Sequence, residues 1–190
     1  MGQRQRLRQI NAYAMNFGLG FGLWWTVGFV WFVAGYSGVL IFHTLFLLVL
    51  LSVPFVGVWL CIRFRNTIGE GGALGFGEAY LFSVLLYLYA ALVLTVCMWL
   101  YLNFLDGGRL VEVQIATLEG VDETQVPGWT AMKGDLDARV AELGYDSLSD
   151  WMRECLTAVG MSANVLCFNC MAGLLLSFVN ATVLTIQRRK

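Results

Sequence analysis

Two cysteines in the last quarter of the chain have a spacing associated with chemistry. Cys167 and Cys170 form a C-x-x-C unit, which redox-active thiols and zinc half-sites both use. Three residues apart, they share one face of a helix. A structural zinc site needs four ligands, and Cys155 with the single histidine, His43, completes the set poorly. Because cysteine in an apolar helix is usually a small packing residue, we favour packing over redox chemistry and expect no metal or cofactor.

His43 is the one side chain in the sequence that normally titrates near pH 6.5. In a transporter, such a residue could gate proton movement. A lone histidine near the end of a membrane helix is more often hydrogen-bonded to a neighbouring helix or to the interface, and we favour that interpretation.

Acidic residues gather between Asp106 and Glu154, and the candidates there for acid/base or cation chemistry are Asp106, Glu112, Asp122 and Glu123. Their order matches neither an EF-hand loop nor a known catalytic arrangement, and a solvated acidic face is the simpler interpretation. The sequence also contains no Walker loop, nucleophile elbow, dinucleotide fingerprint or metalloprotease motif. We therefore expect no enzyme.

Small and polar residues recur at helical spacing in the last apolar segment. Asn169, Gly173, Ser177 and Asn180 are four, four and three residues apart and so draw a stripe along one helix face. Such residues let membrane helices approach closely and hydrogen-bond, either within one bundle or with a partner. A path for a polar solute is the alternative.

The first apolar segment has the same character. Gly18 and Gly22 form a G-x-x-x-G unit, which predicts a close helix contact. Trp24 and Trp25 follow it in mid-segment, away from the interfacial belt that tryptophan usually occupies. Core packing is the favoured interpretation, and a groove for a lipid tail or an isoprenoid is the alternative.

The elements that position these residues follow from composition. Of 190 residues, 58% are hydrophobic and 13% charged, and the mean hydropathy is +0.69. A soluble domain carries about 25% charged residues. Helices that cross a hydrocarbon core need about 20 apolar residues. We predict an all-α membrane protein with four transmembrane helices at about residues 12–34, 39–62, 78–105 and 160–186. A turn at residues 35–38 separates the first two, and Pro54 is expected to kink the second.

The orientation follows from the clusters of arginine and lysine. Arg4, Arg6, Arg8, Arg63, Arg65, Arg188, Arg189 and Lys190 all fall on one side of these four spans. The positive-inside rule makes that side cytoplasmic, with both termini. Residues 106–159 are then an acidic extracytoplasmic insert, and nucleic acid is not an expected partner because no basic face is concentrated.

The second half of the insert has helical spacing. We predict that the insert packs on the membrane surface or on itself as a helical hairpin with a turn near residues 126–128. A later helix is expected to be capped by Ser147 or Ser149, with Asp150 in its first turn.

A further motif lies at the start of the third span, where residues 71–79 read GGALGFGEA, followed by an aromatic-rich span that ends in YLNFLD at residues 101–106. Over about 35 positions this pattern resembles the bacterial membrane family known as domain of unknown function 4199, found mainly in Bacteroidetes-type bacteria. Gly107 and Gly108 depart from it, since family members tend toward proline there. The resemblance implies this four-helix topology and a bacterial phylum rather than an activity, and it carries over no catalytic residue. The expected location is the bacterial inner membrane.

Together these features favour a non-catalytic membrane subunit or scaffold that associates through its helices with itself or with an envelope complex. The alternative is a small transporter or lipid-handling protein. The bilayer is the one certain partner under either hypothesis.

Overall fold

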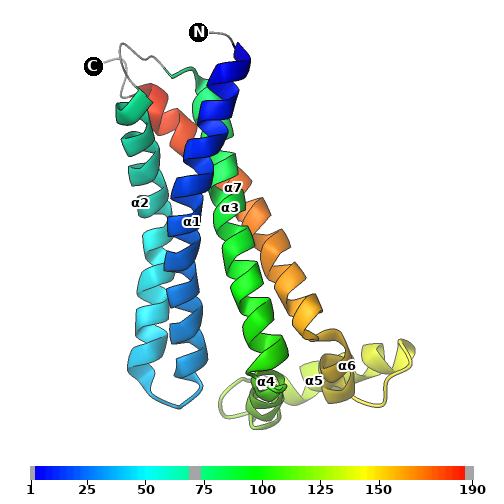
Figure 1. Cartoon of the computed structure of the whole chain (residues 1–190). Coiled ribbons are helices and arrows are strands. Elements are labelled where there is room, and N and C mark those ends of the chain that lie inside the picture. Colours follow the sequence, from blue (N-terminus) through cyan, green and yellow to red (C-terminus); the bar gives the residue numbers. More distant parts are fainter. Residues whose placement is uncertain (1–2, 69–73, 187–190) are drawn as a thin grey trace. The chain divides into compact units, whose positions relative to one another are not determined.

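The computed structural model of this chain describes residues 3–68 and 74–186, and every regular element in those ranges is an α-helix. Four long helices are apolar enough to cross a membrane: α1 (Gln3–Gly35), α2 (Leu40–Ile68), α3 (Phe76–Phe104) and α7 (Ala158–Ile186) (Figure 1). The predicted all-α fold with four such helices is confirmed.

Two of the four long helices extend well beyond the predicted spans, whereas α3 and α7 match theirs to within two residues. Helix α1 begins at Gln3 rather than near residue 12, and α2 ends at Ile68 rather than near residue 62. The predictions followed the apolar residues alone, whereas arginine is itself a good helix former and lets a helix continue beyond the hydrocarbon core. Helix α2 runs unbroken through Pro54.

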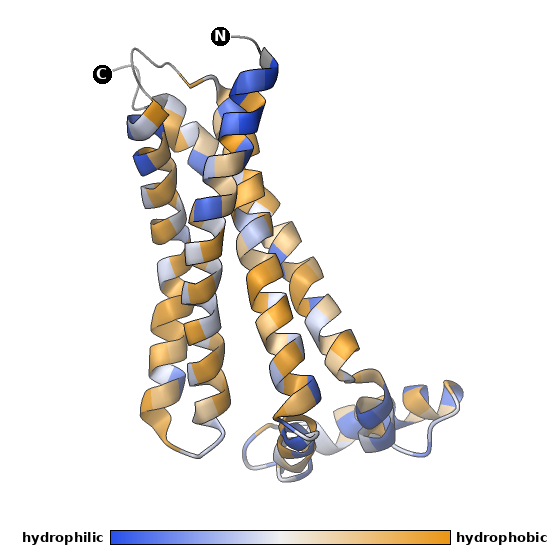
Figure 2. Ribbon diagram, in the orientation of Figure 1, coloured by the Kyte–Doolittle hydropathy of each residue, from blue (hydrophilic) through white to orange (hydrophobic). Residues whose placement is uncertain are grey.

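Helices α1 and α2 form an antiparallel pair (Figure 1). The turn between them lies where the sequence predicts it, at residues 36–38, and Gly38 adopts φ +82°, a left-handed conformation that favours glycine. Arg6 of α1 contacts Glu78 of α3, with Nε and Oε1 2.9 Å apart. Because α1 begins where its antiparallel partner α2 ends, the described arginines of both helices lie at one end of the bundle. Figure 2 shows hydrophilic colour on the first turns of α1 and apolar colour along most of the helix lengths. Arg188, Arg189 and Lys190, and Gly71, Gly72 and Ala73 of the glycine-rich motif, lie outside the described residues.

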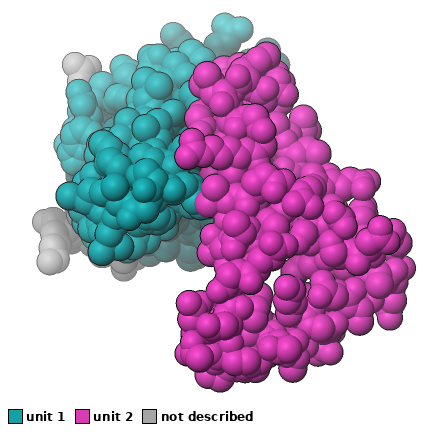
Figure 3. Space-filling view, turned by 90° about the horizontal axis from the view of Figure 1, so that it is seen from below, with its two compact units in different colours: residues 1–98, 163–190 teal, residues 99–162 magenta. Residues whose placement is uncertain are grey.

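The chain divides into two compact units, coloured separately in Figure 3. Unit 1 comprises residues 1–98 and 163–190, and unit 2 comprises residues 99–162. Unit 2 contains three shorter helices: α4 (Arg109–Glu119), α5 (Trp129–Glu142) and α6 (Leu148–Cys155).

The sequence predicted only part of unit 2. Helix α5 begins directly after the expected turn, with Gly128 at φ +82°. Ser147, one of the two serines predicted as the cap, caps α6 and accepts a hydrogen bond from the backbone N–H of Asp150. Helix α4 was not predicted, because eleven residues between two glycine turns give too short a pattern to stand out.

Candidate functional site

A buried hydrogen-bond cluster joins α2, α3 and α7 within unit 1. Asn180 is 1% exposed, and its Nδ2 donates to Ser83 Oγ at 2.9 Å and to Tyr87 OH at 3.4 Å. The sulfur of Cys61 lies 3.7 Å from the same nitrogen. Because an amide without partners is costly in an apolar interior, this cluster fixes the relative position of the three helices.

Two glycines make room for the tyrosine of this cluster. A Cβ at Gly57 of α2 would collide with the hydroxyl of Tyr87, and a Cβ at Gly173 of α7 would lie 2.8 Å from Tyr87 Cβ. Nearby, the rings of Phe64 and Phe82 stack with centroids 3.7 Å apart. The arginine-bearing end of the bundle is therefore closed by close packing.

An apolar cavity of about 420 Å³ lies further along the same bundle. It is partly open rather than fully enclosed, and its volume falls within the roughly 300–1,000 Å³ of small-molecule sites. The residues that line it come from all four long helices of unit 1: Trp25, Gly28, Phe29, Phe32, Phe46, Val49, Leu50, Val53, Pro54, Tyr87, Leu94, Met98, Val165, Phe168, Asn169, Ala172, Gly173 and Leu176.

Polar atoms are few in this cavity. Asn169 uses its Nδ2 to donate to the carbonyl of Val165 at 2.8 Å. Trp25 is 7% exposed, and its Nε1, which has no hydrogen-bond partner, is buried rather than open to the cavity. None of the residues that line the cavity is Asp, Glu, Lys, Arg or His. The site therefore suits a neutral, mostly apolar molecule and offers no group for acid/base catalysis near neutral pH.

The stripe predicted on the last span divides between these two places. Gly173 lies at both, since it lines the cavity and packs on Tyr87, while Asn169 lines the cavity. Ser177 and Asn180 are buried, and Ser177 Oγ donates to the Gly173 carbonyl at 2.6 Å. Gly173, Ser177 and Asn180 thus lie inside the bundle of the same chain, one of the arrangements that the sequence left open, while Asn169 lies at the cavity.

The glycines of α1 pack against α3. A Cβ at Gly18 would lie 2.6 Å from Tyr89 Cβ, and one at Gly22 would lie 2.6 Å from Val93 Cβ and 2.8 Å from the Ala90 carbonyl oxygen. Such spacing brings the two helices together at a distance that no larger residue allows.

His43 and the cysteine pair lie away from the cavity lining. The imidazole of His43 packs on Gly35 beside the ring of Tyr36 at the α1–α2 turn. Cys167 is exposed on α7 and Cys170 is half-buried, and both are free thiols. Among residues 3–68 and 74–186, no three His, Cys, Asp or Glu side chains are grouped as metal ligands.

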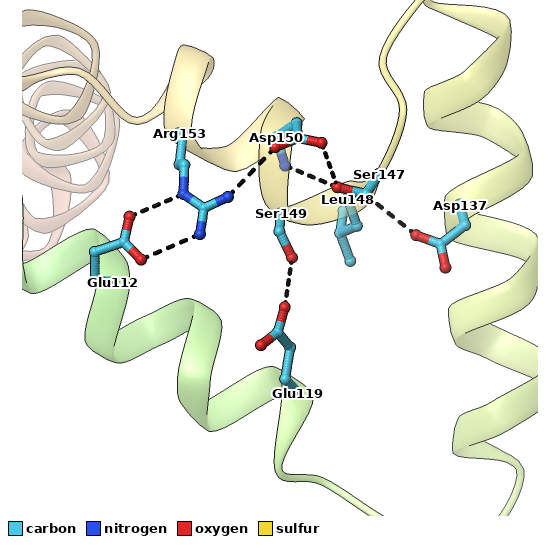
Figure 4. Close-up of polar contacts among 8 residues, drawn as sticks. All are labelled: Glu112, Glu119, Asp137, Ser147, Leu148, Ser149, Asp150 and Arg153. Atoms are coloured by element: carbon cyan, nitrogen blue, oxygen red, sulfur yellow. Dashed lines mark hydrogen bonds and ion pairs between the residues drawn. The ribbon is translucent and has the colours of Figure 1, made fainter.

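Unit 2 has a separate polar network around α6 (Figure 4). Arg153 pairs with Glu112 of α4 through Nε and Oε1 at 2.9 Å and also contacts Asp150. Ser149 Oγ donates to Glu119 at 2.8 Å, and the Leu148 N–H donates to Asp137. The hydrogen bonds from Arg153 lower the pKa of Glu112.

Two further carboxylates in unit 2, Glu123 and Asp122, organise the loop before α5. Oε1 and Oε2 of Glu123 accept from the backbone N–H groups of Thr130 and Gly128, which lowers the pKa of Glu123. Asp122 accepts from the Thr124 hydroxyl and from the Gln125 N–H, and its pKa is lowered as well. The Glu123 contacts satisfy backbone N–H groups at the start of α5, and the Asp122 contacts hold the turn that precedes it, so both sets are structural.

The cavity itself was not predicted from the sequence, although the alternative of a lipid-tail groove near Trp24 and Trp25 pointed to its position. Ser83, Tyr87 and Gly57 were missed because each is an ordinary residue in an apolar helix. Their importance depends on a distant partner, Asn180, that no local pattern reveals.

Four long apolar helices around an apolar cavity define a polytopic α-helical protein able to cross a membrane. This chain belongs to the family described as Protein of unknown function (DUF4199), whose model matches residues 16–185. The expected family is therefore confirmed. Neither a curated protein nor a solved structure matches the chain.

Proposed function

We propose that this chain is a non-catalytic membrane protein that holds a neutral, lipid-like molecule between its four long helices. The observation that carries the proposal is the cavity of about 420 Å³, which is lined by apolar and aromatic side chains and by no ionised residue. A membrane protein that binds an apolar chain needs such a space, whereas a purely structural bundle gains stability by filling it.

The alternative role, a subunit that associates with itself or with an envelope complex, requires a different surface from the one first expected. Gly18, Gly22, Gly173, Ser177 and Asn180 are already used in contacts within the chain. Lipid handling is the better-supported function because its site does not depend on a partner.

The proposal includes a location in the bacterial inner membrane. Arg4, Arg6 and Arg8 of α1 and Arg63 and Arg65 of α2 support a cytoplasmic position for that end of the bundle under the positive-inside rule. Residues 106–159 would then be extracytoplasmic. Labelling of single cysteines with a membrane-impermeant reagent tests this directly, and labelling of residue 106 only in opened cells would contradict it.

Native mass spectrometry of the protein in mild detergent tests the function. We expect an additional mass from a bound apolar molecule. The cavity-lining substitution Ala172→Phe should remove it, whereas Ala163→Phe, at an exposed position on the same helix, should not. Protein that carries no such molecule and takes up none from a lipid extract would contradict the proposal.

A further inference from the structure

The side chain of Arg63 on α2 rests on two aromatic rings. Its guanidinium carbon lies 5.4 Å from the ring centroid of Trp59, one turn earlier on α2, and 5.8 Å from that of Phe17 on α1. Such contacts use the face of a guanidinium and leave the N–H groups at its rim for hydrogen bonds. Because Arg63 and Trp59 are both exposed, a molecule outside the chain can reach that rim.

No carboxylate among the described residues pairs with Arg63. The described part of unit 1 contains one acidic residue, Glu78, and its Oε1 already lies 2.9 Å from the Nε of Arg6. The arginines of α1 and α2 at this end of the bundle are Arg4, Arg6, Arg8, Arg63 and Arg65. This end therefore carries an excess of positive charge, and a counter-ion for Arg63 comes from outside the described chain.

The position of Arg63 along α2 corresponds to the edge of a membrane. Trp59 lies 19 residues after Leu40, the first residue of α2, which is about 28 Å at 1.5 Å per residue. A hydrocarbon core is about 30 Å thick, so a helix that crosses it from Leu40 brings the Trp59 ring and the guanidinium to the boundary with the head groups. A cation without an anion is costly at this depth, whereas lipid phosphates lie directly beside it.

An exposed apolar ridge leads from Arg63 toward the middle of α2. Leu51, Phe55 and Trp59 precede Arg63 at intervals of four residues, so the four side chains follow one face of the helix. The three apolar members are 55% to 75% exposed. An acyl chain can lie along this ridge while the phosphate to which it is attached reaches Arg63.

We propose that Arg63, supported by Trp59 and Phe17, binds the phosphate of an anionic phospholipid. The guanidinium donates hydrogen bonds from its rim to the phosphodiester oxygens, and an acyl chain packs along the ridge. A phospholipid that also carries an ammonium group fits less well, because that group would meet the excess of arginines. The inference requires that the helices cross a bilayer, as in the proposed function, and is independent of the cavity.

Native mass spectrometry of the protein in detergent micelles that contain equal amounts of phosphatidylglycerol and phosphatidylethanolamine tests the inference. Both lipids have a phosphate, but only phosphatidylglycerol is anionic overall, and the two bound lipids differ in mass. The wild type should retain phosphatidylglycerol in preference. Arg63→Gln should lower the ratio of bound phosphatidylglycerol to bound phosphatidylethanolamine by about 5-fold, which corresponds to about 1 kcal/mol for one arginine at an anionic lipid surface.

Arg4→Gln is the matched control, because it removes the same charge from the same end of the bundle. Arg4 lies 31 residues before Gly35, about 46 Å along α1 and so about 16 Å beyond a core of about 30 Å. That distance exceeds the Debye length of about 8 Å at physiological salt, so the ratio should stay at the wild-type value.

The outcomes separate this site from a diffuse charge effect and from the cavity. A fall in the ratio for Arg63→Gln alone supports the inference. No fall for Arg63→Gln, or an equal fall for Arg4→Gln, overturns it. Displacement of phosphatidylglycerol by excess inorganic phosphate would show a site for a small anion rather than for a lipid. Ala172→Phe should leave the ratio unchanged even if the cavity proposal fails, and a fall in this variant would place the lipid in the cavity instead.

Discussion

The same four helices pack in two different ways along their length. At the end that carries the arginines, Asn180, Ser83 and Tyr87 hydrogen-bond across helices, and Gly57 and Gly173 let the backbones come close. Further along, large aromatic side chains meet around open space, and a buried donor has no partner. Since lipid tails are as apolar as the helices, apolar side chains alone do not drive membrane helices together. Close packing therefore depends on small residues and hydrogen bonds, and where these are missing a ligand can enter.

The largest expected effect comes from filling space at the closed end. Gly57→Ala places a methyl group against the buried hydroxyl of Tyr87, which also accepts a hydrogen bond from Asn180. We expect a loss of about 3 kcal/mol, the upper part of the range for overpacking, measured as a lower Tm in detergent. Gly20→Ala is the control, because a Cβ there meets nothing within 4 Å. Equal Tm values for the two variants would mean that this end is not closely packed.

Loss of the amide in the closed region should have the next largest effect. Asn180→Ala removes the donor shared by Ser83 and Tyr87 and leaves a small void, which together cost about 2 kcal/mol. Denaturation in detergent measures it. Asn164→Ala, at an exposed position on the same helix, should change stability by less than about 0.5 kcal/mol. If Asn180→Ala left the free energy of unfolding unchanged, the hydrogen-bond cluster would not stabilise this end of the bundle.

Filling the open region should have a much smaller effect on stability. The added ring of Ala172→Phe has the cavity to occupy, so we expect the Tm of delipidated protein to be unchanged or higher. The Tm values of Ala172→Phe and Gly57→Ala, measured by thermal unfolding under the same conditions, compare the two regions directly. A drop as large as that of Gly57→Ala would show that no free space exists beside Ala172.

The smallest effect concerns unit 2. The lowered pKa of Glu123 means that its contacts stabilise the start of α5 above its usual pKa of 4.5, and that this stability is lost as the pH falls through the lowered value. Hydrogen exchange at the N–H groups of Gly128 and Thr130, corrected for intrinsic rates, should therefore quicken below pH 4.5.

The matched variant for this pH effect is Glu123→Ala. It should exchange rapidly at Gly128 and Thr130 at every pH, because both acceptor oxygens are gone. A pH dependence that persists in this variant would assign the effect to another carboxylate.

The sequence predicted most of the fold, because membrane helices can be recognised from their length and apolar composition. The four long helices, the turn ending at Gly38 and the Ser147 cap all followed from local patterns. It also predicted that Asn180 and Gly173 would face other helices, without indicating which ones. The cavity could not be predicted from local patterns, because its existence depends on how side chains from different helices, such as Phe46 and Phe168, pack around a space that they do not fill.

The indole N–H resonance of Trp25 gives the most direct test of a ligand cavity in this bundle. In nitrogen-15 spectra of delipidated protein in detergent, the chain should give one indole signal for each of its seven tryptophans, with Trp24→Phe and Trp25→Phe supplying two assignments. On addition of a lipid extract, the Trp25 signal should move because the Trp25 side chain lines the cavity, while the signal of Trp24, which is bonded to Ser52 and does not line the cavity, should stay in place. A Trp25 signal that stays fixed at saturating lipid would contradict the presence of a ligand cavity.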